Sequence, residues 1–466
     1  MPQLLGFATA YQTVDLMTNS KRVSQDLSQV LLELFKHGIS NVQPKNILKN
    51  FLKIKDGEVI IYDEPEIITY SAIKKIIPIC IGKASVDMAK TVKSIFRNLK
   101  CKISEGIIVV NKENYEEVLG FKCFISGHPI PDKNGLMASK FIEKILSTSK
   151  KDDLVLVFLS GGGSALLTYP VENINLTEKI KLNKFLLESG ADIKEINTVR
   201  KHLSKIKGGN FLKMSSPSKV HCLILSDVVG DDLSSIASGP TVPDKTSFED
   251  VEKILKKYKI WKELPFSIRK YIERGLNDKE LETPGVKNHL FSNVKNTLIG
   301  SNFLCLKSIN DLCKTRNIKS KIWKKNIEGD VVELAQKFVR DLKKENFAKP
   351  FLLISGGEST VKIKGTGKGG RNQEFSLHFL NCINKLMPKL KFTLLSVGTD
   401  GRDGPTDAAG AIVNHNSLDL IKDKKIDINK ELNNNNSYDV LKKINSLVII
   451  DGTNTNVADL QLLMLN

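Results

Sequence analysis

Short apolar runs that end abruptly in glycine, serine or aspartate recur along this chain. Six of them are rich in Val, Ile, Leu and Phe, at residues 76–81, 154–159, 220–225, 297–299, 351–354 and 392–397. Strands buried on both faces of a parallel sheet have continuous apolar sequences, so each run predicts a buried parallel strand. Amphipathic stretches of helical length lie between the runs, for example at 137–146, 176–187, 251–258 and 331–342. This alternation predicts a doubly wound α/β architecture.

The length of the chain predicts two domains. With 466 residues, 41% of them hydrophobic, the chain is too long for one ordinary core and apolar enough to fill two. The segment 258–296 is the poorest in strand signal and holds Pro265 and Pro284. We therefore predict an N-terminal Rossmann-like domain with a doubly wound parallel sheet over residues 1–257, a C-terminal α/β domain over residues 258–466, and an active site in the cleft between them.

The formal net charge of +18 changes this picture little. Of the 70 basic residues only nine are arginines, and the lysines are spread along every predicted helix. Proteins that bind nucleic acids concentrate arginine, lysine and aromatic residues on one element, and the sequence has no such stripe. A compositional drift toward Lys and Asn accounts for the scattered lysines and also for the asparagine run 433–436. We expect a solvated surface, no nucleic-acid partner, and a positive field that favours anionic substrates.

Cysteine usage and the lack of a long apolar segment bear on the compartment. The seven cysteines lie far apart and form neither a CxxC pair nor a metal-binding spacing, which predicts reduced thiols. No apolar run is long enough to cross a bilayer and no secretory signal is evident, so we expect a cytoplasmic protein without a membrane partner. The first fourteen residues carry no acid and precede Lys21 and Arg22, which leaves a mitochondrial transit peptide open. An ordinary first helix through residues 27–35 is favoured.

The turns after the predicted strands carry the candidate chemistry, because ligands of open α/β sheets sit beyond the carboxyl ends of the strands. The turn 160–164, Ser-Gly-Gly-Gly-Ser, can aim successive backbone N–H groups at phosphate oxygens. It matches neither the Walker P-loop nor the GxGxxG dinucleotide fingerprint. Together with the later turn 238–241 it is our candidate phosphate cradle, with these members: Ser160, Gly161, Gly162, Gly163, Ser164, Ser238, Gly239 and Thr241.

Charged residues stand in the neighbouring turns. Lys83 follows Gly82 directly after the first predicted strand, where its ammonium can face a bound anion. Asp227 and Asp231 follow the strand 220–225, and carboxylates beside a phosphate cradle suggest Mg²⁺ ligands or a general base.

Two further segments are rich in polar groups. The stretch 197–209 predicts a helix that places Arg200, Ser204 and Lys207 on one face and stops at its Gly-Gly end. The second half of the chain repeats the strand-then-glycine design, with Glu358 after one strand, Arg371 in the glycine-rich segment 365–374, and a third polar turn at 396–407; the candidates here include Asn372, Asp400 and Asp403.

Taken in order, these segments resemble the glycerate 2-kinase family, whose C-terminal part is called the MOFRL domain. The resemblance rests on residues 160–166, 197–201, 225–231, 238–241, 369–374 and 398–406. It implies transfer of a phosphoryl group from ATP, with Mg²⁺, to the 2-hydroxyl of D-glycerate, and it implies that Lys83 and Arg371 serve catalysis. The MOFRL-type region would span about residues 350–466.

The expected roles follow from the resemblance together with the turn positions. We expect Lys83, Arg371 and Asp227 to be catalytic, Asp227 and Asp231 to bind Mg²⁺, and the substrate to contact Asn197, Arg200, Lys201, Glu358, Asn372, Asp400 and Asp403. Two departures from the family pattern stand near the C-terminus: Asn436 replaces Asp, and Asn454 replaces Gly. The alternatives left open are an NAD(P)H-dependent hydroxypyruvate reductase and a ligand-binding relative without turnover.

Overall fold

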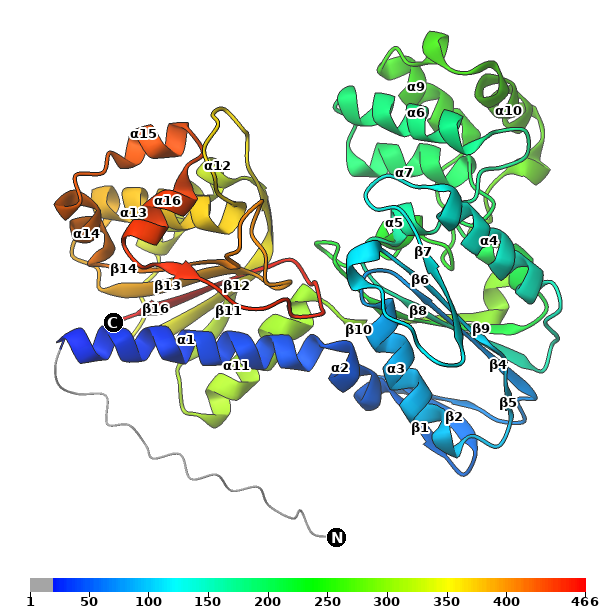
Figure 1. The fold of residues 1–466 in the computed structure, drawn as a ribbon, viewed down its shortest axis with the longest axis horizontal. Coiled ribbons are helices and arrows are strands. Elements are labelled where there is room, and N and C mark those ends of the chain that lie inside the picture. The colour runs from blue at the N-terminus through cyan, green and yellow to red at the C-terminus, as the bar shows by residue number, and fades with distance from the viewer. Residues whose placement is uncertain (1–19) are drawn as a thin grey trace.

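The computed structural model describes residues 20–466, with side chains from residue 27 onward, and folds into two lobes that lie side by side (Figure 1). Helix α1 (Ser20–Val42) includes the predicted first helix. The acid-free first fourteen residues, and with them the transit peptide left open above, lie outside the described residues. No helix within residues 20–466 is long and apolar enough to cross a membrane.

The first lobe is built on a seven-stranded sheet in which every pair of described neighbours is parallel. Its strands are β4 (Lys75–Ile81), β5 (Lys102–Ile103), β6 (Gly106–Val110), β7 (Phe121–Ile125), β8 (Asp153–Leu159), β9 (Lys219–Leu225) and β10 (Val294–Gly300). The order is β10-β9-β8-β4-β6-β7, with β5 beside β4. The chain therefore leaves β4 toward β6 and later returns to β8 on the opposite side, which puts the topological switch point between β4 and β8.

Helices cover both faces of this sheet, as continuous apolar strands require. Ile76 and Cys80 of β4 face the core beneath α3 (Ser85–Ile95), whereas Ile77 and Ile79 face the core beneath α4 (Lys133–Leu146) and α8 (Phe211–Ser215). The predicted Rossmann-like sheet is thereby confirmed.

A helical layer stands above the carboxyl end of the first sheet (Figure 1). It contains α6 (Leu176–Glu188), α7 (Ile193–His202), α9 (Phe248–Lys257) and α10 (Phe266–Asn277), which share a separate apolar cluster. Strand β10 follows this layer in the chain and still pairs with β9. A boundary between residues 257 and 258 would cut β10 away from its own sheet. The strand-poor segment 258–296 belongs to this lobe because it supplies α10 and the approach to β10.

The second lobe holds a six-stranded sheet of mixed direction. Its order is β11 (Ser320–Asp330), β12 (Phe351–Thr360), β16 (Asp459–Leu465), β13 (Phe392–Gly398), β14 (Gly410–Asn414) and β15 (Leu447–Val448). Only β11 and β12 run parallel; β13 is antiparallel to both of its neighbours. The prediction that the run 392–397 forms a parallel strand is therefore wrong, because burial on both faces makes a strand apolar whatever its direction.

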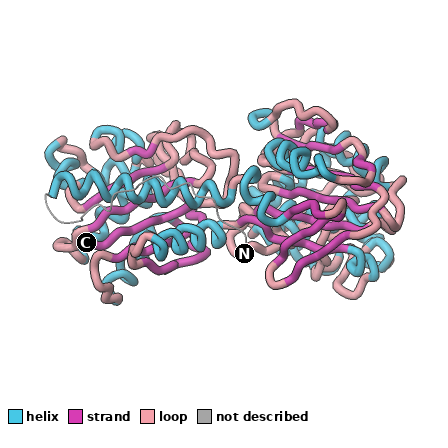
Figure 2. Tube along the Cα trace, turned by 90° about the horizontal axis from the view of Figure 1, so that it is seen from below, coloured by secondary structure: helices cyan, strands magenta, loops and turns pink. Residues whose placement is uncertain are grey.

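Helices also cover both faces of the second sheet. α12 (Val331–Lys344) and α13 (Arg371–Leu386) lie on one face, and α1 and α11 (Asn302–Thr315) lie on the other (Figures 1 and 2). The remaining described elements are α2 (Pro44–Phe51), α5 (Gly163–Leu166), α14 (Ser417–Asp423), α15 (Ile428–Asn433), α16 (Ser437–Lys443), the antiparallel meander β1 (Leu52–Lys55), β2 (Glu58–Asp63) and β3 (Glu66–Tyr70), and the 3₁₀ turns Phe96–Asn98, Lys112–Asn114, Ile236–Ser238, Trp261–Glu263, Lys279–Leu281 and His289–Asn293.

The N-terminal helix thus packs in the C-terminal lobe, and the chain enters the first lobe only through α2. The corner between α1 and α2 contacts a loop of the second lobe: Gln43 Nε2 donates to the carbonyl of Thr453 at 2.9 Å, and Thr455 Oγ1 donates to the carbonyl of Val42 at 3.1 Å. One apolar cluster runs from the first sheet through α1, α2 and α11 to the second sheet. The two lobes are therefore packed together along this side.

Candidate active site

Three turns meet at the carboxyl ends of β4, β8 and β9, next to the switch point. The backbone N–H of Lys83 donates to the carbonyl of Gly161 at 2.9 Å, and Ala84 N–H donates to Ser160 Oγ at 3.1 Å. Gly82 has a φ of +120°, and a Cβ there would lie 2.2 Å from Ser160 Oγ. Only glycine allows the Lys83 turn and the glycine-rich turn to approach this closely.

The glycine-rich turn also admits a carboxylate. A Cβ on Gly161 would lie 2.1 Å from Asp227 Oδ2, and one on Gly163 would lie 2.8 Å from the Cβ of Ala237. The structure therefore brings Lys83, the turn 160–164 and Asp227 together, as the strand-end argument predicted. The Lys83 ammonium makes no hydrogen bond or ion pair with any residue of the described range 20–466.

A cavity of about 560 Å³ opens between the two lobes at this point. The first lobe contributes Lys83, Asn111, Asn114, His128, Ser160 and Gly161 to its lining, and the second contributes Asp400, Arg402 and residues 452–456. Most of these groups are polar, so the cavity suits a small hydrophilic molecule. It lies where the sequence predicted a cleft.

Burial and neighbouring charges shift the pKa values of Asp227 and His128. Burial raises the pKa of Asp227, and Lys83 and the Gly162 N–H oppose that rise. Glu358, which comes from β12 in the other lobe, raises the pKa of Asp227 further by charge repulsion. Burial, and then the positive charge of Lys83, lower the pKa of His128, which favours the neutral imidazole, while the charge of Glu113 opposes this shift.

Arg371, the first residue of α13, is held by two carboxylates of the second lobe. Its Nε and Nη2 bond both oxygens of Asp459 at 2.6 and 2.9 Å, and its Nη1 bonds Glu358 at 2.5 Å. Asp459 is fully buried, and burial raises its pKa to about 7 although Arg371 opposes the rise. Because the charge of Glu358 acts on Asp227, the Arg371 cluster belongs to the same charged region and contributes to it from the second lobe.

Three of the residues predicted to contact the substrate make hydrogen bonds or an ion pair within their own lobe. Asp403 is 2% exposed and accepts the N–H groups of Asn372 at 3.1 Å and Gln373 at 2.9 Å, so it caps the start of α13. Asn372 is buried beneath it and accepts a bond from Ser396. Lys201 is buried and paired with Asp244 at 3.3 Å. None of the three is among the residues that line the cavity between the lobes, although Asp403 directly follows Arg402, which does. Their contact with the substrate stays a prediction.

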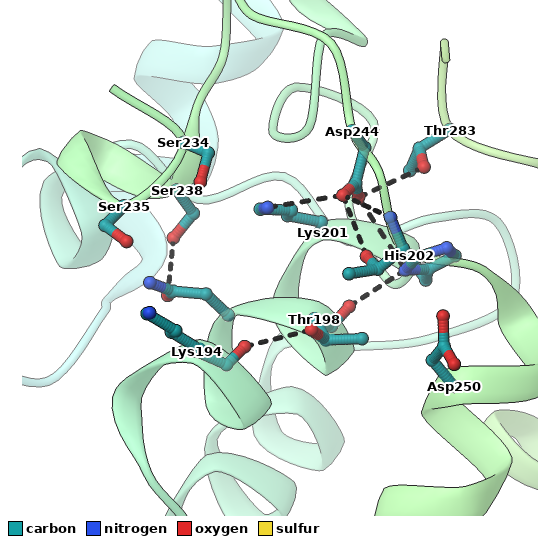
Figure 3. Close-up of polar contacts among 12 residues, drawn as sticks. Lys194, Thr198, Lys201, His202, Ser234, Ser235, Ser238, Asp244, Asp250 and Thr283 are labelled. Atoms are coloured by element: carbon teal, nitrogen blue, oxygen red, sulfur yellow. Dashed lines mark hydrogen bonds and ion pairs between the residues drawn. The ribbon is translucent and has the colours of Figure 1, made fainter. Parts of the chain in front are cut away.

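Figure 3 shows how Lys201 points to Asp244, which also accepts a hydrogen bond from Thr283 and lies beside His202. Helix α7 ends at His202, and residues 203–209 form turns, bends and a single bridge instead of helix. The predicted helical face shared by Arg200, Ser204 and Lys207 is therefore wrong. The chain ends the helix early because Ser204 bonds the carbonyl of Tyr169 and the N–H groups that follow it.

The turn 238–241 lies behind the glycine-rich turn rather than in the cleft. Ser238 Oγ donates to Asn197 at 3.1 Å and lies 3.3 Å from Ser164 Oγ. Gly239 accepts a backbone bond from the 208–209 turn, and Thr241 donates to Asn296 at 2.6 Å. The turn 238–241 thus packs against the glycine-rich turn through Ser238 and Ser164. Asp231, with its φ of +56°, accepts hydrogen bonds from Ser226 and Ser301 instead of converging on Asp227.

Sequence reasoning missed several cleft residues, among them His128. It stands three residues after the end of β7, so the strand-end rule applies to it, but β7 is an edge strand whose half-exposed sequence gave no strand signal. Asn454 has a φ of +57°, a conformation that glycine adopts freely and asparagine tolerates, which accounts for the departure from the family pattern. Its side chain bonds Asp87 of the first lobe.

The asparagine run is a structural element rather than compositional drift. Asn435 Oδ1 accepts the N–H groups of Lys364 and Gly365, and Asn434 Oδ1 accepts that of Thr366. Asn436 accepts the N–H of Lys368 and donates to Glu431. The run holds the glycine-rich segment that leads to Arg371, and the amide at 436 keeps hydrogen bonds that do not need a carboxylate.

Within residues 20–466 no group of three or more His, Cys, Asp or Glu side chains is arranged to hold a metal ion. A Mg²⁺ bound with a nucleotide needs only one or two carboxylates, because phosphates and waters complete its shell. The charge of Glu358 raises the pKa of Asp227, and a divalent cation near both carboxylates would relieve that repulsion. The residues present therefore fit a nucleotide-bound Mg²⁺ and no all-protein metal cage.

Comparison with known proteins finds two family models along the chain: a domain of unknown function, DUF4147, at residues 30–273 and the MOFRL family at residues 351–459. The glycerate 2-kinase of Pyrococcus horikoshii is 38% identical over 93% of this chain and 96% of its own length, and the D-glycerate 2-kinase of Thermotoga maritima is 37% identical over 94% and 98%. The crystal structure of a Thermotoga maritima glycerate kinase matches with a TM-score of 0.82 and 35% identity over 95% of this chain and 100% of that one. A putative hydroxypyruvate reductase of Agrobacterium vitis is 35% identical over 82% of this chain and 86% of its own length.

Proposed function

Because this chain belongs to the glycerate kinase family, with the match covering nearly its whole length, we propose that it transfers the γ-phosphoryl group of ATP to the 2-hydroxyl of D-glycerate, giving 2-phosphoglycerate and ADP. The observation that carries the proposal is the placement of Lys83. Its ammonium has no partner in the described residues and stands at the switch point beside the glycine-rich turn and Asp227. A fixed cation at the mouth of a polar cavity suits a reaction between two anions.

Lys83 and Arg371 would stabilise the charge that spreads over the transferred group. In phosphoryl transfer the protein contributes mainly positioning and fixed positive charge. The Asp459 pair keeps the Arg371 guanidinium in place, whereas its bond to the half-exposed Glu358 is one that a phosphate oxygen can replace. Arg371 could therefore engage the phosphate without losing its anchor.

Asp227 is the proposed acceptor of the 2-hydroxyl proton. Its raised pKa brings the carboxylate closer to the basicity that such an acceptor needs, and it lies against Gly161 of the glycine-rich turn. The proton on the 2-hydroxyl oxygen would pass to Asp227 as that oxygen bonds the γ-phosphorus and the bond from this phosphorus to the β,γ-bridging oxygen breaks, with ADP as the leaving group. Mg²⁺, when bound with the nucleotide, would neutralise phosphate charge, with Asp227 and Glu358 as its proposed neighbours.

Glycerate itself fits the interdomain cavity. Asn111, Asn114 and Arg402 offer hydrogen-bond donors for its carboxylate and 3-hydroxyl, and the neutral His128 offers either a donor or an acceptor. The alternative function, hydroxypyruvate reduction, is favoured by the name of the similar Agrobacterium vitis protein. However, the turn 160–164 lacks the GxGxxG pattern of a dinucleotide site.

The test is a coupled assay on the purified chain. With D-glycerate, ATP and Mg²⁺ we expect ADP release, and enolase added alone should convert the product to phosphoenolpyruvate, because enolase accepts the 2-phosphate and not the 3-phosphate. Lys83→Met should lose at least about a thousandfold in kcat. Lys90→Met, which removes an exposed lysine of α3, is the matched control. NADH oxidation with hydroxypyruvate, or ADP release without an enolase substrate, would overturn the proposal.

A further inference from the structure

A second cavity, of about 470 Å³, lies in the first lobe on the other side of the glycine-rich turn from the cleft. His128 lines both cavities, while Gly161 lines the cleft and Gly162 and Ser164 line the second one. The two spaces are therefore neighbours separated by the turn itself. We call the second one the cationic cavity, after the side chains that line it.

Three basic side chains converge on the cationic cavity from different elements: Lys179 of α6, Arg200 of α7, and Lys207 in the turn after α7. Lys179 is 4% exposed and Lys207 is 1% exposed. Lys179 donates to the carbonyl of Leu203 at 2.8 Å, and Lys207 donates to the carbonyls of Ser164 at 2.9 Å and Ala237 at 3.2 Å. When protonated, Lys179 therefore keeps two further N–H donors and Lys207 keeps one.

One carboxylate lines the cationic cavity, that of Glu188, and it pairs with Lys184 at 3.7 Å. No ion pair within residues 27–466 joins a carboxylate to any of the three basic side chains, and Arg200 donates to the amide oxygen of Asn183 at 3.2 Å. Burial, and then the charge of Arg200, lower the pKa of Lys179 to about 7. Burial, and then Lys179 and Arg200, lower the pKa of Lys207.

Such a cluster is costly in a folded protein. Buried charges are normally paired or neutralised, and like charges brought together add repulsion to the loss of hydration. An anion that entered this cavity would supply the counter-charge that all three side chains lack, and it would favour the protonated form of the two lysines. The cluster is thus preorganised for a ligand that carries several negative charges.

The mouth of the cationic cavity has a different character. Ile130 is 65% exposed and Leu187 is 61% exposed, and Pro129, Pro131 and Ile180 complete an apolar rim. Glycerate has one carboxylate and no apolar surface, so it matches neither the three cations nor this rim. A nucleotide has both a polyphosphate and a flat base.

We propose that the cationic cavity is the nucleotide site of this enzyme, with the polyphosphate held by Lys179, Arg200 and Lys207 and the base against the rim at Ile130 and Leu187. The γ-phosphoryl group would then pass beside Gly162 and His128 into the cleft, where Lys83 and glycerate meet it. This assignment rests on the proposed function, and it adds two lysines that the family motifs above do not contain.

The experiment is calorimetric titration of the full chain with ADP and, separately, with D-glycerate and with inorganic phosphate. Lys179→Met and Arg200→Gln should each weaken ADP binding at least tenfold and leave glycerate binding unchanged. Lys181→Met is the matched control, since it removes an exposed lysine two residues away on the same helix α6 and should bind ADP like the wild type. At pH 8, ADP binding should take up protons, because the anion restores charge to the buried lysines, and Lys179→Met should reduce this uptake.

Each outcome decides the assignment. If both variants fold, by circular dichroism, and bind ADP as the wild type does, the cationic cavity is not the nucleotide site, and the kinase proposal stands. If they lose glycerate binding instead, the cavity holds the substrate and the assignment is reversed. A wild-type chain that binds inorganic phosphate here but no ADP overturns both proposals. Lys179→Met that unfolds would leave Arg200→Gln, whose half-buried side chain is easier to replace, as the deciding variant.

Discussion

Replacing Arg371 by alanine should damage both stability and turnover, for separate reasons. The substitution strands Asp459, a fully buried carboxylate whose two oxygens are both bonded by the guanidinium. Breaking a buried pair by removing one partner costs about 3–5 kcal/mol. The pKa of Asp459 is already raised to about 7 by burial, and without Arg371 it should rise further. The folded variant can therefore take up a proton near neutral pH.

The sign of the pH dependence follows from this rise. A carboxyl whose folded pKa lies above its unfolded value binds more protons in the folded state, so it stabilises less as the pH increases. Arg371→Ala should thus lose more of its unfolding free energy at pH 8.5 than at pH 6. Adding Asp459→Asn removes the stranded charge, and the double variant should regain most of the lost stability at every pH.

Turnover separates the catalytic role from the anchoring role. A cation that acts in the transition state contributes about a thousandfold or more, on the order of 4 kcal/mol. The double variant should remain at least that far below the wild type in kcat, with urea melts to verify that it is folded. If it keeps more than about a tenth of wild-type kcat, Arg371 is an anchor only. If Arg371→Ala alone is as stable as the wild type, the reasoning about the buried pair fails.

Three further predictions follow from contacts described above. Gly161→Ala would push a Cβ into the carboxylate of Asp227 and should lower kcat at least about a hundredfold with circular dichroism unchanged. The control Gly285→Ala, whose Cβ would meet nothing closer than 3.9 Å, should retain activity. Equal activity of the two variants would contradict the close approach of Gly161 and Asp227. In ligand-free protein, the unfolding free energy of the wild type minus that of Lys179→Met should rise by a few kcal/mol as the pH goes from about 7 to 10.5, because in this range the unfolded wild type binds more protons than the folded one. If denaturant melts show the same difference at every pH, the lowered pKa of Lys179 is refuted. Asp244→Ala should destabilise the protein by about 3–5 kcal/mol in the same melts and change KM for glycerate less than threefold, whereas a large KM effect would put its lysine partner back in the site.

The strands of the first sheet could be predicted because each has a local signature, an apolar run that stops at a polar turn. The pairing of those strands could not, because it depends on contacts between residues far apart in sequence. β10 is separated from β9 by α9 and α10 of the upper layer and still closes the first sheet, and the first described helix packs in the last lobe. The direction of β13 escaped prediction for the same reason.

The candidate site divides along a similar line. Lys83, the turn 160–164 and Asp227 could be predicted because they follow three adjacent strands and so must meet. Asp403 and Lys201 looked equally functional in sequence, since a polar residue beside a glycine or in a helix has the same letter whether it binds a ligand or bonds the backbone. Lys179 gave no signal at all, because only the fold shows that it is buried without a carboxylate.

The corner between α1 and α2 has a mechanical meaning. Gln43 and Val42 hold the loop that carries Thr453 and Thr455, and this loop lines the cleft. Any rotation of one lobe against the other that bends this corner must drag the loop along the cleft wall. The α1–α2 corner and the cleft loop would therefore move together, so the shape of the cleft and the angle between the lobes are coupled.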